Sequence, residues 1–181
     1  MTVHIPTKKA MNGSIRVKME QCVQEDLDGF DLRLLAALQD NGRLTNQEVG
    51  DRIGLSPSQC SRRRSALEAV GLIRGYRADL AAEALGFGLL VFVNVTLAAH
   101  SRGNALGFRD LIAGVDEVQE AYALTGDADY LLKVVVRDLK DLSILVNDVL
   151  LAHDTVGRVR SSIVLDRLKE TIRLPLLKTP R

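Results

Sequence analysis

The chain has 181 residues, of which 46% are hydrophobic and 26% are charged, and its formal net charge is +1. These values indicate an ordinary soluble chain of one or two domains and do not indicate disorder. The apolar runs are shorter than the roughly 20 residues that cross a bilayer, and the N-terminus lacks a signal-peptide core, so we expect a cytoplasmic protein without membrane contact. The two cysteines, Cys22 and Cys60, predict neither a disulfide framework nor a zinc site, and Cys60 is expected to be buried.

The charge divides the chain into parts. Leu27 to Ala78 holds eight basic and six acidic residues, a net +2, whereas Phe87 to Leu165 holds seven and ten, a net −3. We therefore expect a first domain at 27–78, a hinge at 79–86 and a second domain at 87–165, followed by a short basic tail at 166–181. Residues 1–26 are expected to be a disordered extension.

The first domain begins with a predicted helix. Asp28 or Asp31 serves as its N-cap, and Gly42 is its stop. Its apolar residues recur at helical spacing, at Leu27, Leu34, Leu35 and Leu38.

Two shorter helices follow. Thr45 with Glu48 three residues later has the pattern of a capping box, and Gly54 ends that helix. Ser56 is the next N-cap, with Pro57 at the first helical position, Gln59 three residues after the cap and Gly71 at the end. Two helices joined by a three-residue turn predict a helix-turn-helix, whose second helix enters the major groove of DNA.

Three consecutive arginines lie on that second helix. Cys60 and Leu67 define its buried stripe, so Arg62 points away from the domain and is predicted to reach base edges. Arg63 and Arg64 flank the stripe, and we expect their guanidinium groups to reach outward to phosphates. The alternative is a solvated basic helix with one arginine paired to the first helix. The predicted DNA-binding residues are Ser56, Ser58, Gln59, Ser61, Arg62, Arg63, Arg64 and Ser65.

Between the domains, Tyr76 is expected to lie in a wing-like strand and Gly86 in the hinge. The second domain then has the order βαββαβ. Strands are predicted in 89–97, 115–124, 130–136 and 156–165, with helices in 102–114 and 139–151. This order predicts a ferredoxin-like domain with two helices on one face of an antiparallel sheet, and apolar residues on the other face favour dimerisation.

The loop from Thr125 to Tyr130 is a second candidate site. Its acidic pair, Asp127 and Asp129, can act as general acid and base, bind a cation or hold an ammonium group, and a plain polar turn accounts equally well for these residues. The histidines His4, His100 and His153 have neither ligand spacing nor a partnered nucleophile, so we expect no metal, no cofactor and no enzyme.

The stretch from Leu27 to Leu80, "LDGFDLRLLAALQDNGRLTNQEVGDRIGLSPSQCSRRRSALEAVGLIRGYRADL", resembles the N-terminal domain of the Lrp/AsnC (leucine-responsive/asparagine-operon) regulators. The resemblance continues in "GDADY" and the strands around it, to about Leu177. It implies an α+β protein with a winged helix-turn-helix and a ferredoxin-like effector and assembly domain. Two departures are Arg64, where relatives often carry an aliphatic residue, and Ser161, where they often carry threonine.

This resemblance also implies a function. We expect a DNA-binding transcriptional regulator of amino-acid-related genes that binds a double-stranded operator and forms homodimers and higher oligomers, a tetramer or an octamer. An amino-acid effector is expected between dimers. The implied effector residues are Gly126, Asp129 and Tyr130, with Thr125, Asp127 and Ser161 as weaker candidates. The competing classes are a sensing module without DNA binding and a small-metabolite enzyme.

Overall fold

The structure, a computed structural model, describes residues 27–176. The chain divides into two compact units. One unit runs to Ala78 and takes in the chain from Thr171 onward, and the other is Asp79–Glu170. Cys22, His4 and the predicted extension at 1–26 lie outside the described residues.

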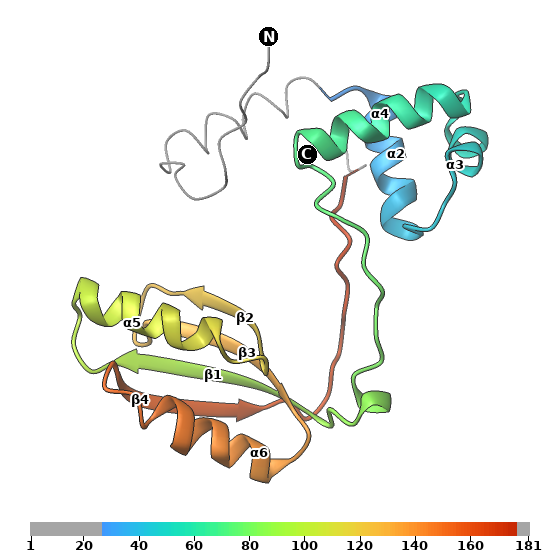
Figure 1. The fold of residues 1–181 in the computed structure, drawn as a ribbon. Helices are drawn as coiled ribbons and strands as arrows, with labels where there is room; N and C mark the ends of the chain where they lie inside the picture. The colour runs from blue at the N-terminus through green and yellow to red at the C-terminus, as the bar shows by residue number, and fades with distance from the viewer. Residues whose placement is uncertain (1–26, 177–181) are drawn as a thin grey trace. The chain divides into compact units, whose positions relative to one another are not determined.

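The first unit contains three helices, α2 (Gly29–Asp40), α3 (Asn46–Ile53) and α4 (Pro57–Ala69) (Figure 1). Each begins with a capping box in which the N-cap and the third helical residue exchange hydrogen bonds. The N-cap of α2 is Asp28, and Asp31 is its reciprocal partner, so the two candidates act together. The predicted caps Thr45 and Ser56 are confirmed.

These helices share one core. Leu34, Val49, Ile53, Cys60 and Leu67 are buried in it, which confirms the predicted burial of the cysteine. The turn between α3 and α4 is tight because Gly54 adopts a left-handed conformation, with φ of 76°. This packing fixes α4 as the second helix of a helix-turn-helix.

The predicted wing-like strand around Tyr76 is wrong, since the described backbone has no strand between α4 and the short 3-10 helix η1 (Glu83–Leu85). Among the described residues of the first unit there is no strand with which it could pair. The Tyr76 side chain instead packs beside α4, where it hydrogen-bonds to Glu68. Aromatic β-propensity at one position therefore does not make a strand without a partner.

The C-terminal segment of the first unit is held against α2. Gln39 and the backbone of Leu174 exchange two hydrogen bonds, of 2.6 Å from the Leu174 nitrogen and 3.2 Å to its oxygen. Arg173 forms an ion pair of 2.7 Å with Asp40. The end of the chain thus contributes to the unit that contains α4.

The second unit has the predicted order βαββαβ (Figure 1). Its elements are β1 (Leu89–Leu97), α5 (Arg102–Ala113), β2 (Val118–Ala123), β3 (Tyr130–Val136), α6 (Leu139–Ile144) with its π-helical continuation η2 (Leu145–Leu150), and β4 (Val156–Ile163). All neighbouring strands are antiparallel in the order β2-β3-β1-β4. The ferredoxin-like prediction is confirmed.

The two faces of this sheet differ. Val91, Val93 and Val95 of β1 are fully buried in a core to which α5, α6 and η2 contribute Phe108, Leu142 and Leu150. Alternate residues of the same strands lie on the opposite face, which we call the open face. The open face carries Leu90, Phe92, Asn94, Thr96, Leu131, Lys133, Val135, Arg158, Arg160 and Ser162. Within the second unit, α5 and α6 lie on the other face of the sheet (Figure 1).

Candidate functional site

The outward surface of α4 starts at its N-cap. The Ser56 hydroxyl accepts a hydrogen bond from the Gln59 backbone at 3.3 Å, and the Gln59 side chain accepts one from the Ser56 backbone at 3.0 Å. Ser58 is joined to this cap through a 3.1 Å contact between the Ser56 and Ser58 hydroxyl oxygens. These side chains are exposed, so the predicted residues at the start of α4 form an accessible helix N-terminus.

Further along α4, Ser61, Arg62 and Ser65 are exposed on the same outward surface. Within residues 27–176, the Arg62 guanidinium takes part in no ion pair. Arg62 is thus exposed on α4, as the helical wheel predicts. Arg62 presents a complete set of guanidinium donors to whatever approaches α4.

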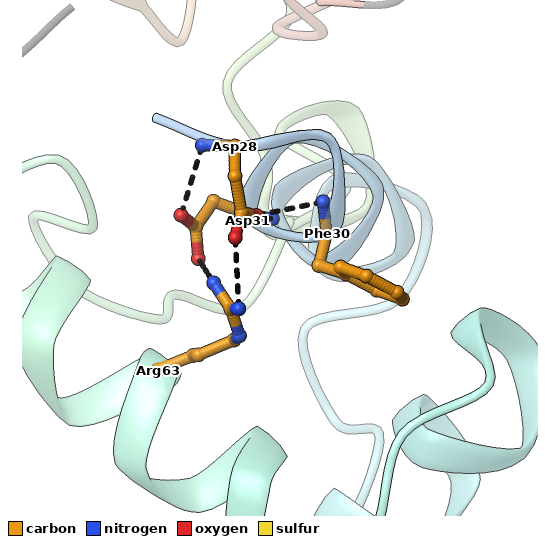
Figure 2. Close-up of polar contacts among 4 residues, drawn as sticks. All are labelled: Asp28, Phe30, Asp31 and Arg63. Atoms are coloured by element: carbon orange, nitrogen blue, oxygen red, sulfur yellow. Dashed lines mark hydrogen bonds and ion pairs between the residues drawn. The ribbon is translucent and has the colours of Figure 1, made fainter. Parts of the chain in front are cut away.

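Arg63 is turned toward α2 (Figure 2). One of its terminal nitrogens lies 2.8 Å from a carboxylate oxygen of Asp28, and the other lies 2.8 Å from an oxygen of Asp31. Its guanidinium carbon is also 5.6 Å from the centre of the Phe30 ring. The expectation that this guanidinium reaches outward is wrong, and the alternative of an arginine paired to the first helix describes Arg63.

The pairing changes the acid–base behaviour of both partners. The backbone N–H of Asp31 donates to the Asp28 carboxylate, and this bond together with the Arg63 guanidinium lowers the pKa of Asp28. The hydrogen bond to Asp31 raises the pKa of Arg63. The capping box of α2 and the ion pair from α4 are thus one charged network.

Arg64 is also engaged within the domain, so its predicted outward orientation is wrong as well. It donates to the Tyr76 hydroxyl at 2.7 Å and to the Leu44 carbonyl at 3.2 Å, and its guanidinium carbon lies 4.4 Å from the Tyr76 ring centre. The same hydroxyl donates to Glu68 at 2.9 Å. Burial raises the pKa of the Tyr76 hydroxyl. Arg64 therefore fastens the segment that leaves the domain to α4.

In the second unit, the candidate loop is anchored where it enters β3. The Asp129 carboxylate accepts a hydrogen bond of 2.8 Å from the Leu97 backbone and lies 3.2 Å from Nδ1 of His100. Tyr130 is only 8% exposed, and its ring centre is 4.6 Å from that of Phe108 in the core. Asp129 and Tyr130 thus hold the loop in place, and Tyr130 is not accessible from solvent within this unit.

The remaining loop residues face a cavity of about 410 Å³ at one end of the open face. It is lined by Thr125 and Asp127 together with Asn94, Thr96, Leu124, Ala128, Arg158 and Arg160. Gly126 lies between the two loop residues with φ of 122°, which favours glycine there. Ser161 pairs with Val93, whose side chain is buried on the helix-covered face, so Ser161 lies on the other side of the sheet.

Within a single chain the six predicted effector residues therefore lie apart: Thr125 and Asp127 line the cavity with Gly126 between them, Asp129 anchors the loop, Tyr130 is in the core and Ser161 is on the helix-covered face. Sequence reasoning missed the two arginines of the cavity. The signal in the sequence is the spacing of Arg158 and Arg160, which are two residues apart on a strand and therefore lie on one face of the sheet.

Within the described residues, no group of three His, Cys, Asp or Glu side chains is placed to hold a metal ion. None of the described helices has the length and apolarity needed to cross a membrane.

Both units match known families. Residues 27–74 match the family described as winged helix-turn-helix DNA-binding, and residues 90–174 match the Lrp/AsnC ligand binding domain. The chain is 37% identical over 154 residues to a leucine-responsive regulatory protein of Rhizobium meliloti, covering 85% of this chain and 99% of that protein. It is also 37% identical to the leucine-responsive regulatory protein of Escherichia coli K12, over 86% of this chain and 94% of that protein.

Solved structures agree with this similarity. A transcriptional regulator from Neisseria meningitidis, determined in complex with L-Met, is 40% identical and superposes with a TM-score of 0.81. That alignment covers 83% of this chain and 97% of the Neisseria chain. An AsnC family regulator from Agrobacterium tumefaciens is 31% identical with a TM-score of 0.78, over 83% of this chain and 97% of its own.

Proposed function

Because the chain belongs to the Lrp/AsnC family of transcriptional regulators, we propose that it reads its operator through Arg62 and the exposed start of α4. It combines a helix-turn-helix DNA-binding domain with a ligand-binding domain. The observation that carries the proposal is that Arg62 is exposed and outside every ion pair of residues 27–176, whereas its two arginine neighbours are engaged within the domain. A free guanidinium suits the bidentate contact with a guanine edge in the major groove.

The remaining exposed residues of α4 support the docking of this helix. Ser58, Ser61 and Ser65 provide hydroxyl groups for phosphate oxygens, and the helix N-terminus at Ser56 favours an anion. Gln59 belongs to the cap and orients that N-terminus. Arg63 and Arg64 act by positioning α4, because their guanidinium groups are held by partners inside the domain.

The test is a comparison of Arg62→Ala with the unmodified chain on an operator selected from a pool of random duplexes. We expect Arg62→Ala to weaken operator binding by roughly 1 to 3 kcal/mol and to leave binding to random DNA nearly unchanged. Affinity of the unmodified chain should fall steeply with salt. Absence of any saturable DNA complex would instead support a sensing module that does not bind DNA.

The second unit binds a small effector, for which an amino acid is the proposed class. The support is the L-Met complex of the Neisseria relative and the charged cavity beside Thr125 and Asp127. An ammonium group suits the Asp127 carboxylate, and Gly126 allows close approach of the backbone. Asp129, Tyr130 and Ser161 contribute by shaping the loop or by facing a neighbouring copy. Calorimetry with the twenty amino acids tests this class.

The proposed assembly is a homodimer, with tetramers or octamers built from it. The support is the open face of the sheet, on which Leu90, Phe92, Leu131 and Val135 are only half-buried in the single chain. A second copy would bury these side chains, at about 25 cal/mol for each Å² of apolar surface removed from water. Dimer symmetry also suits a two-fold operator, since paired recognition helices read paired half-sites.

A further inference from the structure

Along β1, the open face of the sheet changes from apolar to polar residues. Leu90 and Phe92 begin the face on β1, and Asn94 and Thr96 continue it. Strand register places Arg160 opposite Asn94 and Arg158 opposite Thr96. Two polar pairs thus lie side by side at the end of the sheet that meets the Thr125 loop, beyond Leu90 and Phe92 on β1 and next to Leu131, which pairs with Asn94.

The cavity at this polar end has an unbalanced charge. Its lining includes two guanidinium groups, from Arg158 and Arg160, and one carboxylate, from Asp127, which gives a formal charge of +1. Among residues 27–176, neither arginine forms an ion pair, although carboxylates elsewhere in the unit pair with Lys133 and Arg137. Its volume of about 410 Å³ is within the range of small-molecule sites.

From this arrangement we infer that the cavity binds an amino acid with an acidic side chain. Such a ligand has one ammonium and two carboxylates, and the site offers the complementary set. Asp127 accepts from the ammonium, while Arg158 and Arg160 each donate to one carboxylate. The ligand carries a net charge of −1, which matches the +1 of the lining.

Neutral amino acids match this lining less well. Their single carboxylate leaves one guanidinium without an anionic partner in a site that the ligand removes from water, and an unpaired polar group in such a site is costly. The hydroxyl of Thr96 and the amide of Asn94 can serve the ligand's remaining oxygens in either case. Selectivity therefore comes from the second arginine. The inference rests on the proposed amino-acid effector and specifies its class and its site.

The experiment is calorimetry on the full chain with two matched ligand pairs, L-glutamate against L-glutamine and L-aspartate against L-asparagine. Each pair has nearly the same shape and differs by one negative charge. We expect the acidic member of at least one pair to bind tenfold or more tightly. Arg158→Gln and Arg160→Gln should each remove this preference, and Asp127→Asn should weaken both members of the pair.

Arg109→Gln is the matched control, because Arg109 is exposed on α5, against the other face of the sheet. It should leave the preference unchanged. Light scattering on every variant distinguishes loss of ligand binding from loss of assembly. The preference for the acidic ligand is first measured on the unmodified chain, so this part of the test does not depend on the folding of any variant.

Two results would overturn the inference and are distinguishable from failure of the proposed function. Equal affinity for both members of each pair, or a preference that survives both arginine substitutions, would reject this site and its class while an amino-acid effector stands. Absence of binding by every amino acid, with operator binding intact, would reject the inference and the effector together and leave the DNA-binding role.

Discussion

Replacement of Arg63 by alanine separates a positioning arginine from a DNA-contacting one. The Arg63 side chain is 25% exposed and the Asp31 side chain 13%, so the hydrogen-bonded ion pair between them is largely shielded from water. A hydrogen bond to a charged group contributes about 1.5 to 3 kcal/mol. Asp28 is 47% exposed, and its screened contact adds little. We therefore expect Arg63→Ala to lower the free energy of unfolding by about 2 kcal/mol.

Chemical denaturation followed by circular dichroism measures this loss, and Arg62→Ala is the matched control. Because Arg62 is exposed and outside any ion pair of the described chain, its removal should change stability by less than about 0.5 kcal/mol. Arg63→Ala should thus lose stability, whereas Arg62→Ala should keep its stability and lose operator affinity.

Arg63→Lys refines the test. Lysine keeps the positive charge but lacks the planar fork that reaches Asp28 and Asp31 together, so it should recover less than half of the lost stability. The reasoning would be refuted if Arg63→Ala unfolded like the unmodified chain and lost affinity equally for operator and random DNA. That result would identify Arg63 as a phosphate contact that leaves its carboxylates when DNA binds.

Four further outcomes follow from the structure. Phe92→Glu on the open face should convert the proposed dimer to a monomer in light scattering, whereas Leu106→Glu on exposed α5 should not. Gly50→Ala should lower the free energy of unfolding by roughly 1 to 3 kcal/mol in denaturant titration, because its Cβ would lie 2.4 Å from a backbone oxygen. Gln39→Ala removes two hydrogen bonds to the C-terminal segment and should increase proteolysis after residue 170. Since the pKa of Asp28 is lowered in the folded chain, its contribution is present above the unfolded pKa near 4 and is lost as pH falls below it; Asp28→Asn should flatten that acid loss in pH-dependent unfolding.

Much of the fold was predictable because its signals are local. Each N-cap of the first unit and its partner lie three residues apart, so the capping boxes at Thr45 and Ser56 are visible in the chain itself. The strand predicted at 130–136 is present as Tyr130–Val136, and its residues alternate in burial. The wing-like strand predicted at Tyr76 is absent, because a strand depends on a partner strand that the local sequence does not reveal.

Orientation of long side chains was the main error at the candidate sites. A helical wheel gives the direction of each Cβ, but a guanidinium group several bonds away follows its nearest partners. Those of Arg63 lie 32 and 35 residues earlier in the chain, at Asp31 and Asp28. The cavity at Arg158 and Arg160 was missed for a related reason: strand register brings these residues beside Asn94 and Thr96, which lie more than 60 residues earlier in the chain.

The engaged arginines have a consequence for DNA binding. A helix with three free arginines would neutralise up to three phosphates, and each phosphate contact contributes about −0.9 to the slope of log affinity against log salt. Because Arg63 and Arg64 are held inside the domain, α4 makes two fewer phosphate contacts than a helix with three free arginines. The slope of log affinity against log salt should therefore be shallower by roughly 1.8 than for such a helix. The hydrogen bonds of Arg63 and Arg64 fix α4 to α2 and to Tyr76, so the proposed contact of Arg62 with DNA would lose less conformational freedom on binding. Two of the three consecutive arginines therefore hold α4 in the domain, and the third, Arg62, is the one proposed to contact the operator.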